Sequence, residues 1–494
     1  MRKEIVISLA VFSITTGVKA QENNKQPNIL LLMSDEHNTS ILGCDGNKLA
    51  RTPVLDALAK TGIYFKSFYC SSPQCVPSRQ SLTTGQYVSH HNVWGNTQGV
   101  PEGTPSLARI LNSVGYESYL SGKMHYMGIA SHGFTILDDN SKKKNDGGAE
   151  PENYVGGRRK RLPADLFPDD KGEIGKEFRD LGGVDGPVGP SDKRIAKTVS
   201  EFLKNRKMSD KPFFLTMGLS APHYPLTVPN TLLAKYVGKI PPAEIPEGYL
   251  ESLPLNYRHL RNDRKLEHLP ASTVQLARES YYAKVEWMDS LMGTVIETLR
   301  KSPLYENTII IYMSDHGENM GEHGMWWKNT LYDTGSRVPL IISYPKKWKG
   351  GQVRQGAAGT VDLVKTIAEI GGAKTPIDWD GDSMLEWINN PDFKWKDYSI
   401  TEYYGPYLSS GISMIRMGVW KYVYHTRADA KHPAEYELFN LINDPKELHN
   451  LAGDPAQKQR LYDMHIFLVK KLGEDPEQTE LRWKKGATPA MPNL

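Results

Sequence analysis

The 494-residue chain contains only three cysteines, Cys44, Cys70 and Cys75. So few cysteines cannot build the disulfide framework that small secreted domains depend on, although Cys44 and Cys70 could form one bridge. Neither sign of charge is in large excess, because the chain has 60 basic and 57 acidic side chains. The sequence therefore offers neither a basic stripe for nucleic acid nor an acidic tail, and we expect no nucleic-acid partner.

The sequence also has no apolar run long enough to cross a bilayer, so we expect no membrane span. Its first 20 residues instead have the pattern of a signal peptide: two basic residues, a short apolar run and a small-residue cleavage site ending at Ala20. Sparse cysteines and a single glycosylation sequon at Asn38 favour a bacterial periplasm over a lysosome. We therefore expect an exported protein.

Apolar runs alternate with helical patterns through most of the chain, which predicts an α/β fold with a sheet covered by helices. The expected strands are 28–33, 117–120, 213–219, 308–313 and 338–343, and the expected helices are 53–60, 105–114, 191–206 and 274–300. At this length the chain exceeds one ordinary core. We therefore expect a main domain over residues 21–390 and a smaller second unit.

The second unit is expected over residues 391–483, because short strands there precede one helical pattern. This order is typical of a small α+β subdomain. Residues 138–190 are rich in Gly, Pro, Asp and Lys without periodicity and predict a loop insertion around the mouth of the site. Residues 484–494 predict a flexible tail.

Two expected strands end in carboxylates. Asp35 and Glu36 follow the first apolar run, and Asp315 followed by His316 ends the run at 308–313. Residues at the carboxyl ends of parallel strands meet at one edge of the sheet. Three carboxylates would repel one another there unless a cation lay between them. The pattern predicts a hard divalent ion held by oxygen ligands.

Residues 75–85 read Cys-Val-Pro-Ser-Arg-Gln-Ser-Leu-Thr-Thr-Gly. This segment predicts a short helix with Cys75 at its N-terminus, Ser78 as a possible cap, and Gly85 at its end. Free amide groups at a helix N-terminus favour an anion, and Arg79 adds a planar fork of donors that matches sulfate or phosphate oxygens. The segment therefore predicts an anion site.

The same eleven residues match, at every fixed position, the C-x-P-S-R-x-x-x-x-T-G signature of the type I sulfatases, which belong to the alkaline-phosphatase superfamily. The chain resembles this family from about residue 27 to 470. The resemblance implies a large, mixed, mostly parallel sheet. It also implies that a sulfatase-maturing enzyme oxidises Cys75 to formylglycine, whose hydrated aldehyde supplies the hydroxyl that attacks sulfur.

The family carries one calcium ion, and the resemblance implies that Asp35, Glu36, Asp315, His316 and the formylglycine at position 75 hold it. Glu36 departs from the common form, in which a second Asp stands at this position, and its longer side chain leaves direct ligation open. The resemblance further implies catalytic roles for Lys123, His125, His223 and Lys328, which match basic residues of the family.

These roles fit the negative charges of the substrate and of the leaving group. A sulfate ester is an anion and its departing alcohol develops a second negative charge, so cations must surround the sulfuryl oxygens and an acid must reach the leaving oxygen. We expect Arg79, Lys123, Lys328 and the metal to do the first. We expect His223 to protonate the leaving group and His125 to take the remaining hydroxyl proton when sulfate is released.

Aromatic and amide side chains near these motifs suit a sugar, and we expect Trp94, Asn96 and Trp326 to bind substrate, although the rings could equally be core or rim residues. The preferred interpretation is an exported sulfatase acting on sulfated carbohydrates. Two alternatives remain open: a phosphate or phosphonate ester hydrolase of the same superfamily, and a glycan-binding pseudoenzyme in which Cys75 is never converted.

Overall fold

The computed structural model describes residues 26–128, 130–138, 178, 180–405 and 407–486. The expected signal peptide, most of the expected insertion at 138–190 and the end of the expected tail lie outside these residues. Within them, no helix is long and apolar enough to cross a membrane.

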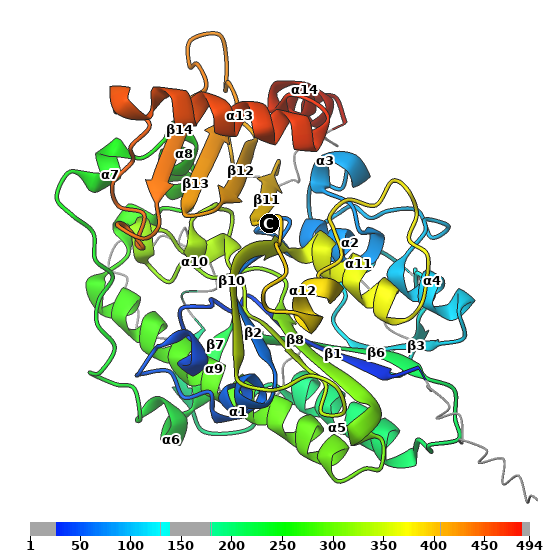
Figure 1. The fold of residues 1–494 in the computed structure, drawn as a ribbon. Helices are drawn as coiled ribbons and strands as arrows, with labels where there is room; N and C mark the ends of the chain where they lie inside the picture. Colours follow the sequence, from blue (N-terminus) through cyan, green and yellow to red (C-terminus); the bar gives the residue numbers. More distant parts are fainter. Residues whose placement is uncertain (1–25, 129, 139–177, 179, 406, 487–494) are drawn as a thin grey trace, which may run out of the picture.

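A mixed sheet of eight strands forms the centre of the molecule, in the order β10-β2-β9-β8-β1-β6-β3-β4 (Figure 1). Its strands are β1 (Asn28–Asp35), β2 (Ile63–Tyr69), β3 (Glu117–Gly122), β4 (Thr135–Ile136), β6 (Phe213–Pro222), β8 (Thr308–Ser314), β9 (Leu340–Ser343) and β10 (Gln352–Gly359). Only β9 pairs antiparallel with its neighbours, β2 and β8. The predicted large, mixed, mostly parallel sheet is confirmed.

The four strands expected to carry site residues are immediate neighbours in this sheet. Strand β1 pairs in parallel with β8 on one side and with β6 on the other, and β6 pairs in parallel with β3. Their carboxyl ends therefore lie at one edge, where ligands of parallel sheets bind. The contiguous order β8-β1-β6-β3 brings together residues from positions 35, 123, 223 and 315.

Alternation of side chains along β1 divides the core into two layers. Leu30 and Leu32 face the layer of α1 (Pro53–Thr61), α5 (Pro190–Asn205) and α9 (Ala271–Arg300). Ile29, Leu31 and Met33 face the opposite layer. That layer contains α4 (Leu107–Ser113), α11 (Thr360–Ile370) and α12 (Leu385–Asn389). Strand β1 is buried on both faces, which explains its unbroken apolar run.

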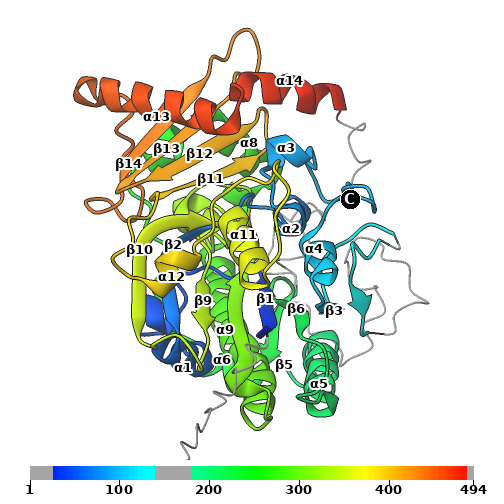
Figure 2. The same cartoon turned by 45° about the vertical axis from the view of Figure 1, so that its right-hand side comes forward.

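The C-terminal part forms the predicted α+β unit above this edge of the main sheet (Figure 2). Its antiparallel sheet has the order β11-β12-β13-β14 and consists of β11 (Tyr398–Tyr403), β12 (Ile412–Met417), β13 (Trp420–His425) and β14 (Glu435–Asn440). Helix α13 (Lys458–Leu472) packs on it through Met464 and Leu468. The boundary near residue 390 stays a prediction.

The remaining elements are short. They are α2 (Cys75–Thr84), α3 (Val88–His91), β5 (Leu181–Val184), β7 (Leu226–Pro229), α6 (Asn230–Leu233), α7 (Tyr249–Ser252), α8 (Leu255–Asp263), α10 (Asp333–Ser336), α14 (Pro476–Gly486), and 3-10 turns at Gly43–Asp45, Leu266–His268, Tyr305–Asn307, Glu322–Gly324 and Pro455–Gln457.

Two expectations need correction here. Helix α14 includes Lys484 through Gly486, so the predicted tail cannot begin at 484. Within the predicted loop insertion, β5 forms a two-stranded parallel sheet with β7.

Candidate active site

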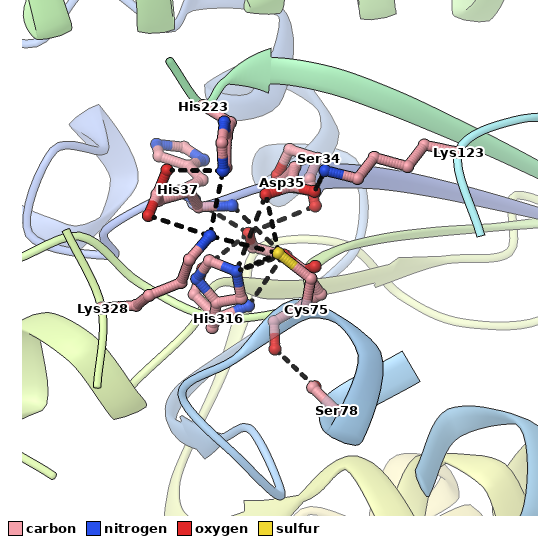
Figure 3. Close-up of polar contacts among 12 residues, drawn as sticks. Ser34, Asp35, His37, Cys75, Ser78, Lys123, His223, His316 and Lys328 are labelled. Atoms are coloured by element: carbon pink, nitrogen blue, oxygen red, sulfur yellow. Dashed lines mark hydrogen bonds and ion pairs between the residues drawn. The ribbon is translucent and has the colours of Figure 1, made fainter. Parts of the chain in front are cut away.

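Helix α2 presents Cys75 as its first residue, at the edge where the four central strands end (Figure 3). Gly85 ends the helix in a left-handed conformation, as predicted. Ser78 does not cap the helix: Gln74 occupies the cap position, and the Ser78 hydroxyl donates a 2.6 Å hydrogen bond to the carbonyl of Asp315. Ser78 therefore ties the Cys75 helix to the end of β8.

Cys75 lies among basic side chains from three other segments. Its Sγ is 3.2 Å from His316 Nε2 and 3.2 Å from Lys328 Nζ. His125 also hydrogen-bonds to the thiol. With a side chain only 1% exposed, Cys75 is enclosed by these partners. The surroundings of Sγ are therefore suited to an anionic group.

Arg79 makes a different set of contacts from the one expected. Its Nε donates to Asp315 at 2.7 Å, its Nη2 donates to Asp35 at 2.9 Å, and its Nη1 donates to the carbonyl of Lys123 at 2.5 Å. Lys123 Nζ also lies 2.5 Å from Asp35. In this structure Arg79 therefore orients two carboxylates and the end of β3.

Glu36 belongs to a neighbouring group of side chains. Its two oxygens lie 3.4 Å from Lys328 Nζ and 3.5 Å from His223 Nε2. Lys328 Nζ is in turn 2.9 Å from His223 Nε2 (Figure 3). Glu36 has a left-handed backbone with φ of 69°, so its side chain departs from the direction that the strand gives to Asp35. The two adjacent carboxylates thus serve different partners.

Charge, more than burial, sets the protonation states here. Burial alone would raise the pKa of the Cys75 thiol, but the cations Lys328, Lys123 and His316 hold that pKa well below its usual value. Burial would likewise raise the pKa of Asp35, yet the nearby cations keep it low. The site therefore stabilises negative charge at position 75.

The basic partners show the opposite shift. Burial opposes the charged form of His316, but Asp315 raises its pKa to about 9. Burial also opposes the charged forms of Lys328 and His223, but Cys75, Glu36 and Asp35 raise the pKa of Lys328, and Glu36 and Asp35 raise that of His223. Opposite charges in this buried site therefore favour one another's ionised forms.

The residues present fit a metal ion. Asp35, Cys75, Asp315 and His316 each place one donor atom within 4.8 Å of the others, and all four are buried. A second such group contains Asp35, Glu36 and His223. Both carboxylate oxygens of Glu36 are buried without a hydrogen-bond donor among the described residues. Buried carboxylates that lack donors are the ligands that a hard cation takes.

Several residues that support this site were not predicted from the sequence. Asp192, in the first turn of α5, accepts from the amides of Ser220 and Ala221 at 2.9 Å and so fixes the end of β6 before His223. Glu318 accepts from the amides of Met320 and Trp327, which shapes the loop that presents Lys328. In the sequence, Asp192 is marked only by its position shortly after Gly189-Pro190, a pair that often precedes a helix.

The three residues expected to bind substrate have other contacts. Trp94 is 6% exposed and packs edge-on against Tyr404. Trp326 is 3% exposed and packs against Phe178. The side chain of Asn96 accepts a 3.1 Å hydrogen bond from the amide of Val76. Their burial favours the alternative left open for the rings, that they are packing residues, and Asn96 supports the helix that carries Cys75.

Comparison with known proteins connects this geometry to a family. The sulfatase family profile matches residues 27–373, and the profile of the N-sulphoglucosamine sulphohydrolase C-terminal region matches residues 321–473. The chain is 29% identical to a choline-sulfatase of Rhizobium meliloti, over 87% of this chain and 83% of that protein. It is 24% identical to an N-acetylglucosamine-6-O-sulfatase of Bacteroides thetaiotaomicron, over 99% and 95% of the two chains.

The fold is also similar to solved structures. One of them is a protein in complex with its substrate D-glucosamine-2-N,6-O-disulfate, with a TM-score of 0.70 and 21% identity over 94% of this chain and 99% of that one. At this level of identity the likeness concerns the fold. The arrangement of strands around Cys75 is thus one that other proteins share.

Proposed function

This chain belongs to the sulfatase family of sulfuric ester hydrolases, and we propose that it is an exported enzyme that removes sulfate from carbohydrates through a formylglycine made from Cys75. The main support is the position of Cys75: it begins α2, is buried, and has basic side chains of three segments around its sulfur atom. A neutral structural cysteine would not need such surroundings.

Formylglycine and calcium both fit the residues present. Formylglycine at position 75 would supply the hydroxyl that attacks sulfur, and a bound divalent cation would stabilise negative charge on the sulfuryl oxygens. Asp35, Asp315 and His316 would hold the ion, and an oxygen at position 75 would take the place of Sγ in the donor set. Arg79 keeps the two aspartates in position, because it donates to one oxygen of each.

The basic side chains bind and orient the sulfate group. Lys123 and Lys328 flank Asp35 and Cys75, so they can donate to sulfuryl oxygens as charge builds up on them. His125 hydrogen-bonds to position 75, where it can accept the hydroxyl proton that must leave before sulfate is released. Lys328 and His125 contact position 75, and Lys123 contacts the neighbouring Asp35.

The leaving alcohol needs a proton from the other side of the site. Burial and Lys328 act to lower the pKa of His223, but Glu36 and Asp35 raise it overall, which favours the protonated form that a general acid needs. Asp192 anchors the segment before His223, because it accepts hydrogen bonds from the amides of Ser220 and Ala221, and this supports His223 as the general acid.

A carbohydrate substrate is supported by relatives rather than by the rings near the signature. A relative with 24% identity is named for a sulfated sugar, and a structure of similar fold contains one. Export is supported by the signal-like pattern of residues 1–20.

Peptide mass spectrometry of protein from a host with a sulfatase-maturing enzyme tests the proposal. We expect formylglycine at position 75 and hydrolysis of sugar sulfates. Paired aryl sulfate and aryl phosphate esters separate the sulfatase from a phosphate or phosphonate ester hydrolase. Active protein that carries only unmodified Cys75, or that prefers the phosphate ester, would contradict the proposal.

A further inference from the structure

Arg264 is an arginine that the proposed chemistry does not use. It is the C-cap residue of α8, and its guanidinium lies over two aromatic rings. The guanidinium carbon is 4.9 Å from the centre of the Trp327 ring and 3.8 Å from the centre of the Tyr407 ring. Stacking on two rings fixes the plane of the guanidinium without using its hydrogen-bond donors.

The donors of Arg264 have no partner among the residues that the structure describes. Its Nε is buried and makes no hydrogen bond, and no described carboxylate forms an ion pair with it. Arg278 is paired with Glu322 and Arg337 with Asp45, whereas the buried Arg416 also has Nε and Nη1 without a hydrogen-bond partner among the described residues. A positioned cation with unused donors is expected where an anionic ligand binds.

Arg264 lies on the side of the site where the alcohol must leave. Trp327, which it contacts, directly precedes Lys328, and the Trp327 ring lies 5.9 Å from that of Tyr224, the residue after His223. The buried Tyr403 hydroxyl is near both positive charges, because Arg264 and Lys328 each act to lower its pKa against the effect of burial. With the sulfate at Cys75, as proposed above, Arg264 would lie on the side of Lys328 and Tyr403, where the rest of the substrate is expected.

We propose that Arg264 binds a second anionic group, a carboxylate or a further sulfate, on the sugar that carries the scissile sulfate. This inference rests on the proposed function, since it assumes that the sulfate sits at Cys75. Carboxylate and sulfate share the planar pairs of oxygens that a guanidinium binds with two parallel hydrogen bonds. The preferred substrates are therefore sugars with at least two negative charges.

Binding to the inactive Cys75→Ala protein tests the subsite without turnover. The probes are hexosamines with one sulfate, such as N-acetylglucosamine 6-sulfate, each compared with a disulfated form, such as D-glucosamine-2-N,6-O-disulfate, and with a disaccharide that adds a glucuronate. Calorimetry is expected to give affinities for the dianionic sugars at least about tenfold higher. The two arms distinguish sulfate from carboxylate.

Adding Arg264→Ala is expected to remove this preference, and Arg264→Lys to keep part of it, because lysine retains the charge but loses the planar fork. The matched control is Arg460→Ala, since Arg460 also stacks on a tryptophan, with its guanidinium carbon 3.8 Å from the Trp420 ring centre. That variant should retain the preference. The inference would be wrong if Arg264→Ala lowered the affinities for mono- and dianionic sugars equally. It would also be wrong if the Cys75→Ala protein bound no dianionic sugar more tightly than its monoanionic counterpart.

The failure of this inference is separable from failure of the proposed function. Turnover by the Cys75-containing enzyme, matured in a suitable host, is measured on the same sugars. If sulfate is released equally fast from sugars with and without a second charge, the proposed sulfatase activity stands and the proposed subsite is wrong. Arg264-dependent binding without any sulfate release would retain the subsite and overturn the sulfatase.

Discussion

The two ends of the site differ in how tightly their side chains are held. At the Cys75 end, Asp35 and Arg79 are wholly buried, and Arg79 uses all three of its nitrogens in hydrogen bonds. At the His223 end, the His223 side chain is 28% exposed, and Glu36 has ion pairs but no hydrogen-bond donor among the described residues. A fixed end suits the sulfate, which is the same in every substrate. The looser end suits an alcohol that differs between substrates.

Among the variants that test this comparison, Cys75→Ala should cause the largest loss of activity. We expect sulfate release to fall about 10⁴-fold or more, because the variant cannot supply the nucleophile. The melting temperature should change by less than about 4 °C, since little packing is lost. Cys44→Ala is the control, because Cys44 lies away from the site. Retained activity in Cys75→Ala would place the nucleophile elsewhere.

Removal of the metal should also abolish function at the fixed end. Chelation is expected to lower activity at least about 10³-fold, and added calcium should restore it. Calcium should raise the melting temperature of the parent protein, because a ligand that binds only the folded state stabilises it. Asp315→Asn should reduce that rise. Full activity in protein shown by elemental analysis to be metal-free would contradict the donor set.

His223→Ala tests the looser end. The loss should be about 10² to 10⁴-fold on a sugar sulfate and much smaller on an activated aryl sulfate, because a phenolate leaves without a proton. Both rates are measured on the same preparation. If the two substrates lost activity equally, His223 would bind sulfate, and Lys328 would be the next candidate for the acid.

Glu36→Gln tests to which end of the site Glu36 belongs. In the structure Glu36 pairs with Lys328 and His223 and lies outside the group of four donors around Cys75. We therefore expect Glu36→Gln to weaken calcium binding less than Asp315→Asn does, when both are titrated by thermal shift. Equal weakening would make Glu36 a direct ligand of the ion.

The smallest effect is expected away from both ends, at the ion pair of His90 and Asp380, 2.7 Å apart. The hydrogen bond to Asp380 raises the pKa of His90 to about 9 from its usual 6.5. The pair therefore stabilises the fold fully below pH 6.5, and this contribution is lost as the pH rises through about 9. His90→Gln should cost about 1 kcal/mol at pH 6 and less at pH 10, after allowance for solvent screening.

Urea unfolding at the two pH values measures this cost. His449→Gln is the control, because the His449 side chain is 78% exposed. An equal loss for His90→Gln at both pH values would mean that packing, and not charge, is responsible.

The sequence predicted the central strands because burial on both faces leaves unbroken apolar runs, as in β1. It predicted where the site residues meet because parallel strands place their ends together. It did not predict β10, whose residues 352–359 include Gln, Arg and several small residues, since an edge strand needs no apolar run. Strand β2 was missed as well, although it is mostly buried.

Contacts between distant segments were harder to predict than positions at strand ends. Nothing in residues 75–85 indicates that Arg79 uses its donors on Asp35 and Asp315, because this depends on the relative placement of three segments. The same holds for Arg264, whose ring partners are far apart along the chain. Trp94 and Trp326 lie near the motifs in sequence, yet they are buried against other rings.

The segment just before Cys75 is held by the far end of the chain. The amide of Glu402 donates a 2.9 Å hydrogen bond to the carbonyl of Ser71, and the Thr401 hydroxyl donates a 2.7 Å hydrogen bond to that of Cys70. A ribosome reaches these two residues more than 300 positions after Cys75. Once they dock, the thiol is 1% exposed. We therefore expect an enzyme that oxidises Cys75 to act before these contacts form.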